Sequence, residues 1–98
     1  MGTIMILERA EITAKEGKKD EFVAVLQDQG VALIKTIPGV LDVRVGGGIE
    51  SPDKVLLLVD WESLAAHEAF KKTPEYVELG KLIGPYGAGG AAEHFEMK

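Results

Sequence analysis

The stretch KVLLLVDW at residues 54–61 constrains the fold of this 98-residue chain more than any other. In an extended strand, alternate side chains point to opposite faces of the sheet. Four apolar side chains then share one face and two share the other: Val55, Leu57, Val59 and Trp61 against Leu56 and Leu58. A strand that is apolar on both sides needs cover on both sides. We therefore expect a central strand with apolar cover on each face of its sheet.

Strand and helix signals alternate around this central strand. Alternating apolar and polar side chains predict further strands at residues 3–13, 40–48 and 91–98. Apolar side chains at helical spacing predict two helices, one from after Gly17 to Pro38 and one from Leu64 to near Gly84 with a break at Thr73 and Pro74. Residues 84–90, GPYGAGG, are so rich in glycine that we expect a mobile loop there.

The predicted order is β-α-β-β-α-β, the split βαβ arrangement of α+β, ferredoxin-like folds. In this arrangement two helices cover one face of a four-stranded antiparallel sheet. The chain length suits one domain, so we assign residues 1–98 to a single domain. The helix-free face is apolar along the central strand, and its simplest cover is the same face of a second copy related by two-fold symmetry. We therefore predict a homodimer through the helix-free face.

Composition excludes several classes of partner and site. Eleven basic against sixteen acidic residues give a net charge of −5, so we expect no nucleic acid partner. The chain has no cysteine, which excludes disulfides and thiolate chemistry. No apolar stretch is long enough to span a membrane and the first residues lack signal-peptide features, so we expect no membrane partner and a cytoplasmic location. The two histidines lack a short metal-ligand spacing, and we expect no metal site.

The second predicted helix places a histidine among apolar side chains. Leu64, His67 and Phe70 are three residues apart, so we expect all three to face the sheet. A neutral imidazole in that place can accept a proton from a bound phenol or quinol. The alternative is a core histidine that is hydrogen-bonded to a backbone carbonyl. Trp61, at the end of the central strand, is in the same way either the wall of a pocket or simply the largest core residue.

Three further polar side chains are candidates for the same cleft. Gln29 falls in the centre of the apolar face predicted for the first helix, where a ligand, a water or a backbone group would have to satisfy its amide. Tyr76 and Tyr86 flank the end of the second helix, where a phenol either closes over a substrate or packs the loop down. Polar groups on the sheet-facing sides of both helices favour a polar aromatic ligand over a lipid.

Five stretches together resemble the antibiotic biosynthesis monooxygenase family of dimeric α+β barrels: KEGKKDEF, IPGVLDVRVG, DWESLAAHEAFKKTPEY, LIGPY and EHFEM. The resemblance implies a ferredoxin-like protomer, a barrel formed by two sheets in the dimer, and a cleft between sheet and helices. It also implies oxygenases in which the anion of a phenol or quinol supplies electrons to oxygen without metal or flavin. Haem-degrading relatives use an asparagine, a tryptophan and a histidine; Ala10, Phe70 and Gly80 stand at the corresponding places, which disfavours haem degradation.

The sequence therefore predicts a homodimeric, cofactor-independent monooxygenase that acts on a small aromatic hydroxy compound. The predicted catalytic residues are His67, Tyr76 and Tyr86, and the predicted substrate-binding residues are Trp61, Gln29, Phe70 and Leu64. Two alternatives use the same cleft. One is a noncatalytic dimer that binds a small aromatic ligand or serves a stress role, and the other is a polyketide-type cyclase or an isomerase that needs no oxygen.

Overall fold

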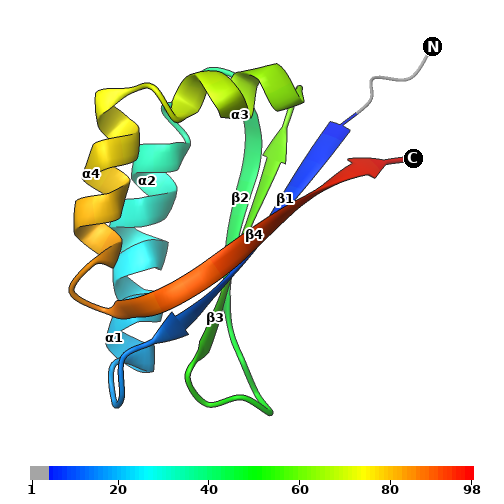
Figure 1. Ribbon diagram of the computed structural model, residues 1–98. Coiled ribbons are helices and arrows are strands. Elements are labelled where there is room, and N and C mark those ends of the chain that lie inside the picture. Colours follow the sequence, from blue (N-terminus) through cyan, green and yellow to red (C-terminus); the bar gives the residue numbers. More distant parts are fainter. Residues whose placement is uncertain (1–4) are drawn as a thin grey trace.

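The computed structural model describes residues 5–98. It is a four-stranded antiparallel sheet with helices on one face (Figure 1). In chain order the elements are β1 (Met5–Ala14), α1 (Lys19–Val25), η1 (Leu26–Gly30), α2 (Val31–Ile34), β2 (Val40–Gly47), β3 (Lys54–Trp61), α3 (Leu64–Phe70), α4 (Pro74–Ile83) and β4 (Gly87–Met97). The strands lie in the order β2-β3-β1-β4. The predicted α+β, ferredoxin-like fold is confirmed. Residues 3 and 4 of the first predicted strand lie outside the described residues.

The strand β3 lies inside the sheet, between β2 and β1, as its apolar character predicts. Its helix-facing side chains are all buried: Val55, Leu57, Val59 and Trp61. On the other face, Leu56 and Leu58 are only half-buried, because no helix covers that side of the sheet (Figure 1). The helix-covered face therefore holds the core, and the helix-free face is partly apolar and open.

The first predicted helix contains a wide turn that the periodicity did not predict. Its buried side faces the sheet through residues spaced by four, namely Phe22, Leu26, Gly30 and Ile34. In an α-helix a step of four overshoots a full turn by about 40°. The π-helical segment η1 rotates less per residue and cancels this drift. The same change turns Gln29 away from the sheet, and its side chain is exposed. The prediction that Gln29 is buried and contributes to a cleft is therefore wrong.

The second predicted helix is two helices, and side-chain caps mark where each begins. Oγ of Ser63 accepts a hydrogen bond from the backbone N–H of Ala66, and Oγ1 of Thr73 accepts one from the N–H of Tyr76. The expected break at Thr73 and Pro74 is confirmed. Among residues 5–98, no helix combines the length and apolar character that a membrane crossing requires.

The side chain of Leu64 does not face the sheet and is 48% exposed, so that prediction is wrong. Each step of three residues falls about 60° short of a full helical turn. Leu64 therefore points about 120° away from Phe70 around α3, and only His67 and Phe70 are buried there.

Of the glycine-rich stretch predicted as a loop, residues 84–86 form a turn, but residues 87–90 are instead the first part of β4. Gly87, Gly89 and Gly90 pair with residues 12–14 of β1 across a bulge. A Cβ atom at residue 90 would lie 2.6 Å from the backbone oxygen of Glu11, and Gly89 has φ of +141°. Glycine therefore permits this pairing instead of preventing it. Figure 1 shows β4 running diagonally from the end of α4 toward the C-terminus.

Candidate functional site

His67 is buried on the sheet-facing side of α3, and its ring lacks the partners of an ordinary core histidine. The residue is 7% exposed, and Nδ1 has no hydrogen-bond partner within residues 5–98. Nε2 lies 3.6 Å from Oε2 of Glu8, which is beyond hydrogen-bond distance. The imidazole packs edge-on against the indole of Trp61, with ring centroids 5.3 Å apart. The alternative of a histidine that is bonded to a backbone carbonyl is not what the structure contains.

Glu8 is the residue of this site that sequence reasoning missed. It lies on β1 opposite Val59 of β3, on the helix-covered face. The indole N–H of Trp61 donates a hydrogen bond of 2.9 Å to Oε1 of Glu8, which leaves Oε2 directed at His67. The signal was present in the sequence, because alternation along the first strand places Glu8 on the same side as Ala10 and Ile12. A carboxylate on an apolar strand face is a candidate for function.

His94 joins this group from the edge strand. It stands directly opposite Glu8 in the β1–β4 register, and its ring centroid lies 4.3 Å from that of His67. The residue is exposed. Donor atoms of Glu8, His67 and His94 all lie within 4.8 Å of one another. Sequence spacing did not predict this cluster, because its members come from β1, α3 and β4.

Burial holds the pKa of His67 below its usual value of 6.5. The neighbouring His94 and Lys71 also lower this pKa, whereas the carboxylates of Glu8 and Glu68 raise it. The balance keeps the imidazole neutral near pH 7, so the ring can accept a proton there. A neutral, buried base is suited to proton abstraction from a bound acid.

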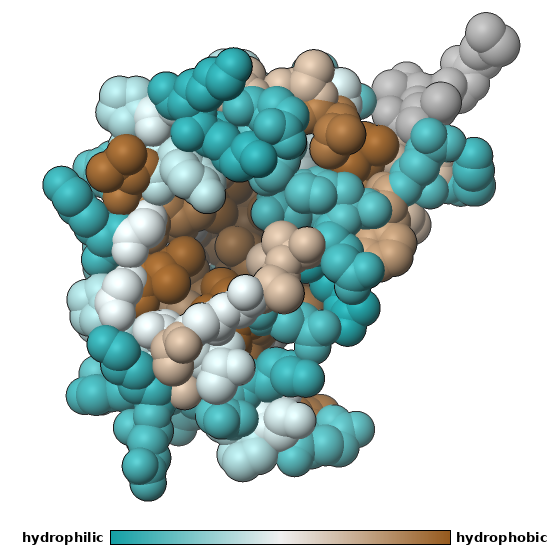
Figure 2. Space-filling model, in the orientation of Figure 1, coloured by the Kyte–Doolittle hydropathy of each residue, from teal (hydrophilic) through white to brown (hydrophobic). Residues whose placement is uncertain are grey.

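A cavity of about 270 Å³ opens beside these groups, between the sheet and the helices α3 and α4. Trp61, His67, Phe70 and Tyr76 line it, together with Glu8 at its polar end. Figure 2 shows the opening as a hollow with an apolar floor, with hydrophilic residues above it and residues of intermediate hydropathy to its left and below. A cavity with apolar walls and a few converging polar groups is the usual form of a small-molecule site.

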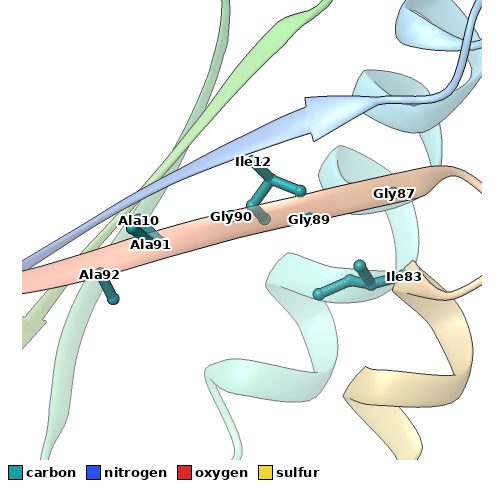
Figure 3. Close-up of a pocket in the computed structure, with 8 residues that line it drawn as sticks. All are labelled: Ala10, Ile12, Ile83, Gly87, Gly89, Gly90, Ala91 and Ala92. Atoms are coloured by element: carbon teal, nitrogen blue, oxygen red, sulfur yellow. The ribbon is translucent and has the colours of Figure 1, made fainter.

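A second hollow of about 340 Å³ adjoins the first, because Ala92 lines both. It lies along the glycine-rich part of β4, between Ile12 of β1 and Ile83 of α4 (Figure 3). Among its labelled lining residues no side chain is charged or polar. The two hollows together form a groove with a polar end at Glu8 and His67 and an apolar end at residues 87–92.

The structure brings four of the seven predicted site residues together and separates the other three. Trp61, His67, Phe70 and Tyr76 line one cavity, and the ring of Tyr76 packs edge-on against Phe70 at 5.3 Å. Tyr86 lies elsewhere: its ring stacks on Phe22 with centroids 6.0 Å apart, and it packs against the buried cluster of Ala14, Phe22, Leu26 and Val55. Gln29 and Leu64 are exposed and line no part of this cavity.

Residues 5–81 match the antibiotic biosynthesis monooxygenase family. The chain belongs to this family. It is also similar to the uncharacterized protein YczJ of Bacillus subtilis strain 168, with 33% identity over 94 residues that cover 94% of this chain and 98% of YczJ. Membership supports a monooxygenase-like or small-molecule-binding protein.

Solved structures of similar proteins share the fold. A Bordetella bronchiseptica protein, provisionally described as an antibiotic biosynthesis monooxygenase, superposes with a TM-score of 0.89 at 29% identity, covering 97% of this chain and 98% of that one. A Caulobacter crescentus CB15 protein with the same provisional description gives a TM-score of 0.80 at 22% identity, over 98% of this chain and 92% of that one. At 22% identity, the similarity to the Caulobacter crescentus protein supports the fold and no function.

Proposed function

We propose that this protein is a monooxygenase that oxidises a small phenol or quinol in the cavity beside His67, without a cofactor. The observation that carries the proposal is a buried imidazole with an unpartnered ring at the wall of a small-molecule cavity. Membership of the antibiotic biosynthesis monooxygenase family supports the reaction class.

In the proposed reaction His67 is the base. The hydroxyl of a bound phenol donates its proton to Nε2 of His67, and the phenolate that remains is the electron-rich species. Glu8 stabilises the imidazolium that forms, because its Oε2 lies 3.6 Å from Nε2. The hydrogen bond from Trp61 to Oε1 of Glu8 holds the carboxylate in this orientation.

The phenolate then supplies the electrons to oxygen. A new C–O bond forms between a ring carbon and O2, and the imidazolium of His67 returns its proton to the peroxide. The resulting hydroperoxide loses water, which takes the hydrogen of the same ring carbon, to leave a carbonyl. The balance is phenol plus O2 giving quinone plus water, with one oxygen atom in each product. All four electrons that reduce O2 come from the aromatic substrate, so the protein supplies only proton transfer and positioning.

Three aromatic side chains at the cavity wall position the substrate. The ring centroids of Trp61 and Phe70 lie 5.7 Å apart at the cavity wall, and Tyr76 extends this aromatic surface toward the opening. The phenol end of the substrate lies at His67, and the apolar hollow along residues 87–92 receives a flat hydrocarbon extension. A substituted or fused aromatic compound with one hydroxyl end fits this division.

We also propose a homodimer through the helix-free face. Leu56 and Leu58 lie half-buried in the middle of that face, and Phe95 and Met97 on the same side of β4 are 40% and 41% exposed. Apolar side chains on an open sheet face are stabilised by a second sheet.

The proposal is tested by titrating the protein with a panel of hydroxylated aromatics and quinols while an oxygen electrode records uptake. Trp61 is the chain's single tryptophan, so its fluorescence reports binding in the cavity. We expect quenching together with oxygen uptake above the protein-free rate, and about 10²-fold or greater loss of uptake in His67→Ala. Tyr86→Phe is the matched control, because Tyr86 lies outside the cavity.

Other outcomes separate the alternatives. Quenching without oxygen uptake favours a noncatalytic binding protein or a cyclase, and conversion of the compound without oxygen identifies the cyclase. Uptake that persists in His67→Ala contradicts the role of His67 as the base.

A further inference from the structure

The three groups around the polar end of the cavity form a ligand set that is typical of divalent transition metals. Two imidazoles and one carboxylate meet there, and each belongs to a different element: His67 of α3, His94 of β4 and Glu8 of β1. This combination on one side of a cation, with positions left open for solvent or substrate, recurs in zinc and non-haem iron proteins.

The distances are close to those a bound cation requires. The three donor atoms lie within 4.8 Å of one another. Metal bonds to imidazole nitrogen and carboxylate oxygen are about 2.0–2.2 Å, so two ligands on the same side of one cation are roughly 3.0–3.5 Å apart. A shift of roughly 1–2 Å in the donor atom of one side chain is enough. His94 can make it, because it is exposed on the edge strand.

Neighbouring side chains lie beside two of these ligands, as in known metal sites, where such neighbours orient the residues that bind the ion. One carboxylate oxygen of Glu8 is occupied by the indole N–H of Trp61 at 2.9 Å, so the other is left for a cation. Nε2 of His67 faces Glu8, while its Nδ1 lies 3.9 Å from Oε1 of Glu68 on the opposite side of the ring. In known metal sites the second nitrogen of a histidine donates a hydrogen bond to such a carboxylate, and a movement of the exposed Glu68 side chain toward Nδ1 would form one here.

We infer that Glu8, His67 and His94 form a binding site for a divalent first-row transition metal ion at the polar end of the cavity. Glu8, His67 and His94 line the same cavity as Phe70 and Tyr76, which leaves space beside the ligands for solvent or substrate.

This inference does not rest on the proposed reaction. A cation at Nε2 of His67 occupies the atom that accepts the phenol proton, so the two uses of His67 exclude each other. Zn²⁺ is therefore expected to inhibit any oxygen uptake that His67 supports.

The test uses the full chain expressed without a polyhistidine tag and stripped with EDTA. Calorimetric titration with ZnCl2 is expected to show one ion per chain. Titration with CoCl2 is expected to quench the fluorescence of Trp61, because the paramagnetic ion lies beside the residue that accepts the indole hydrogen bond. Excess Zn²⁺ is expected to restore it.

Variants show whether the ion lies at the proposed ligands. We expect at least about tenfold weaker Zn²⁺ binding in both His94→Ala and Glu8→Gln. Glu93→Gln is the matched control, because it removes a carboxylate from the same strand on the opposite face and is expected to bind within twofold of the natural chain. His94→Ala changes an exposed residue, so its circular dichroism is expected to be unchanged.

The site is overturned by the absence of saturable Zn²⁺ binding, or by unchanged affinity in either His94→Ala or Glu8→Gln. Because binding is measured without an aromatic compound, its result is separate from that of the oxygenase. Zn²⁺ binding without oxygen uptake retains the metal site alone, and oxygen uptake without Zn²⁺ binding retains the oxygenase alone.

Discussion

The indole N–H of Trp61 donates a hydrogen bond of 2.9 Å to Oε1 of Glu8, across the pair of strands β1 and β3. This bond joins the aromatic wall of the cavity to its only carboxylate lining residue among those described. It directs the free oxygen of Glu8 at the imidazole of His67, 3.6 Å away. In the proposed reaction, binding, orientation and proton transfer therefore depend on one connected group of side chains.

Glu8→Gln is predicted to lower the pKa of His67 further. The carboxylate of Glu8 raises this pKa, and an amide keeps the hydrogen bond from Trp61 but removes the charge. Titration of the imidazole resonances by NMR measures the effect, with Glu11→Gln as the control because Glu11 pairs with Arg9 and Lys54 on the other face. A His67 pKa that rises in Glu8→Gln would show that the carboxylate does not act on the ring as described.

The stability of the protein is predicted to fall as pH decreases below about 6.5. The folded-state pKa of His67 lies below the unfolded value of 6.5, so in this range the unfolded chain binds more protons. The contribution of neutral His67 to stability is fully present above pH 6.5 and is lost as pH falls through the folded-state pKa of this residue. Urea unfolding between pH 5 and 8 in EDTA measures the slope, which is predicted to be shallower in His67→Gln. Equal slopes would show that the dependence does not come from His67.

Two glycine substitutions are predicted to change stability in opposite directions. Gly90→Ala places a Cβ atom 2.6 Å from the backbone oxygen of Glu11 and is expected to destabilise by about 1–3 kcal/mol. Gly80→Ala in α4 meets no atom within 4 Å and is expected to stabilise by about 0.5–1 kcal/mol. Urea unfolding of both variants checks the pair. A neutral Gly90→Ala would mean that β4 does not pair closely with β1 at its glycine-rich end.

Leu58→Glu is predicted to convert a homodimer to a monomer. The substitution places a charge in the centre of the helix-free face, where Arg9 and Arg44 are the cross-strand neighbours of residue 58 and keep the isolated chain folded. Sedimentation equilibrium is expected to give the mass of two 10.5 kDa chains for the natural protein and of one for the variant. A natural protein that sediments as a monomer would refute the proposed dimer.

The sequence predicted most of the fold because the hydrophobic periodicity agrees, over long stretches, with the glycine, proline and capping residues that begin and end the elements. The apolar run that includes Val55 to Trp61 required a central strand, and Pro74 marked the start of α4. Two features were not predictable in this way. The π-helical turn η1 shifts the buried face away from Gln29, and pairing with β1 makes Gly87 to Gly90 a strand. In both places tertiary contacts outweigh the local pattern.

The site was half predictable for a similar reason. Trp61 and His67 stand out because each is a single unusual side chain in an apolar element, and both line the cavity. Glu8 and His94 come from the two ends of the chain, and only the β1–β4 register brings them together. Tyr86 was misplaced because sequence proximity to the end of α4 does not show that its ring turns toward Phe22.

An isotope-labelling experiment tests the central claim most directly. The protein is incubated under ¹⁸O2 with the aromatic compound that quenches Trp61 fluorescence most strongly, and the product is analysed for ¹⁸O. A monooxygenase in which the phenolate reduces oxygen is predicted to give a quinone that carries one ¹⁸O atom, with the second atom in water. Product formation is predicted to fall in His67→Ala and to persist in Tyr86→Phe. A product without ¹⁸O, or ¹⁸O incorporation that is equal in His67→Ala, would contradict the account.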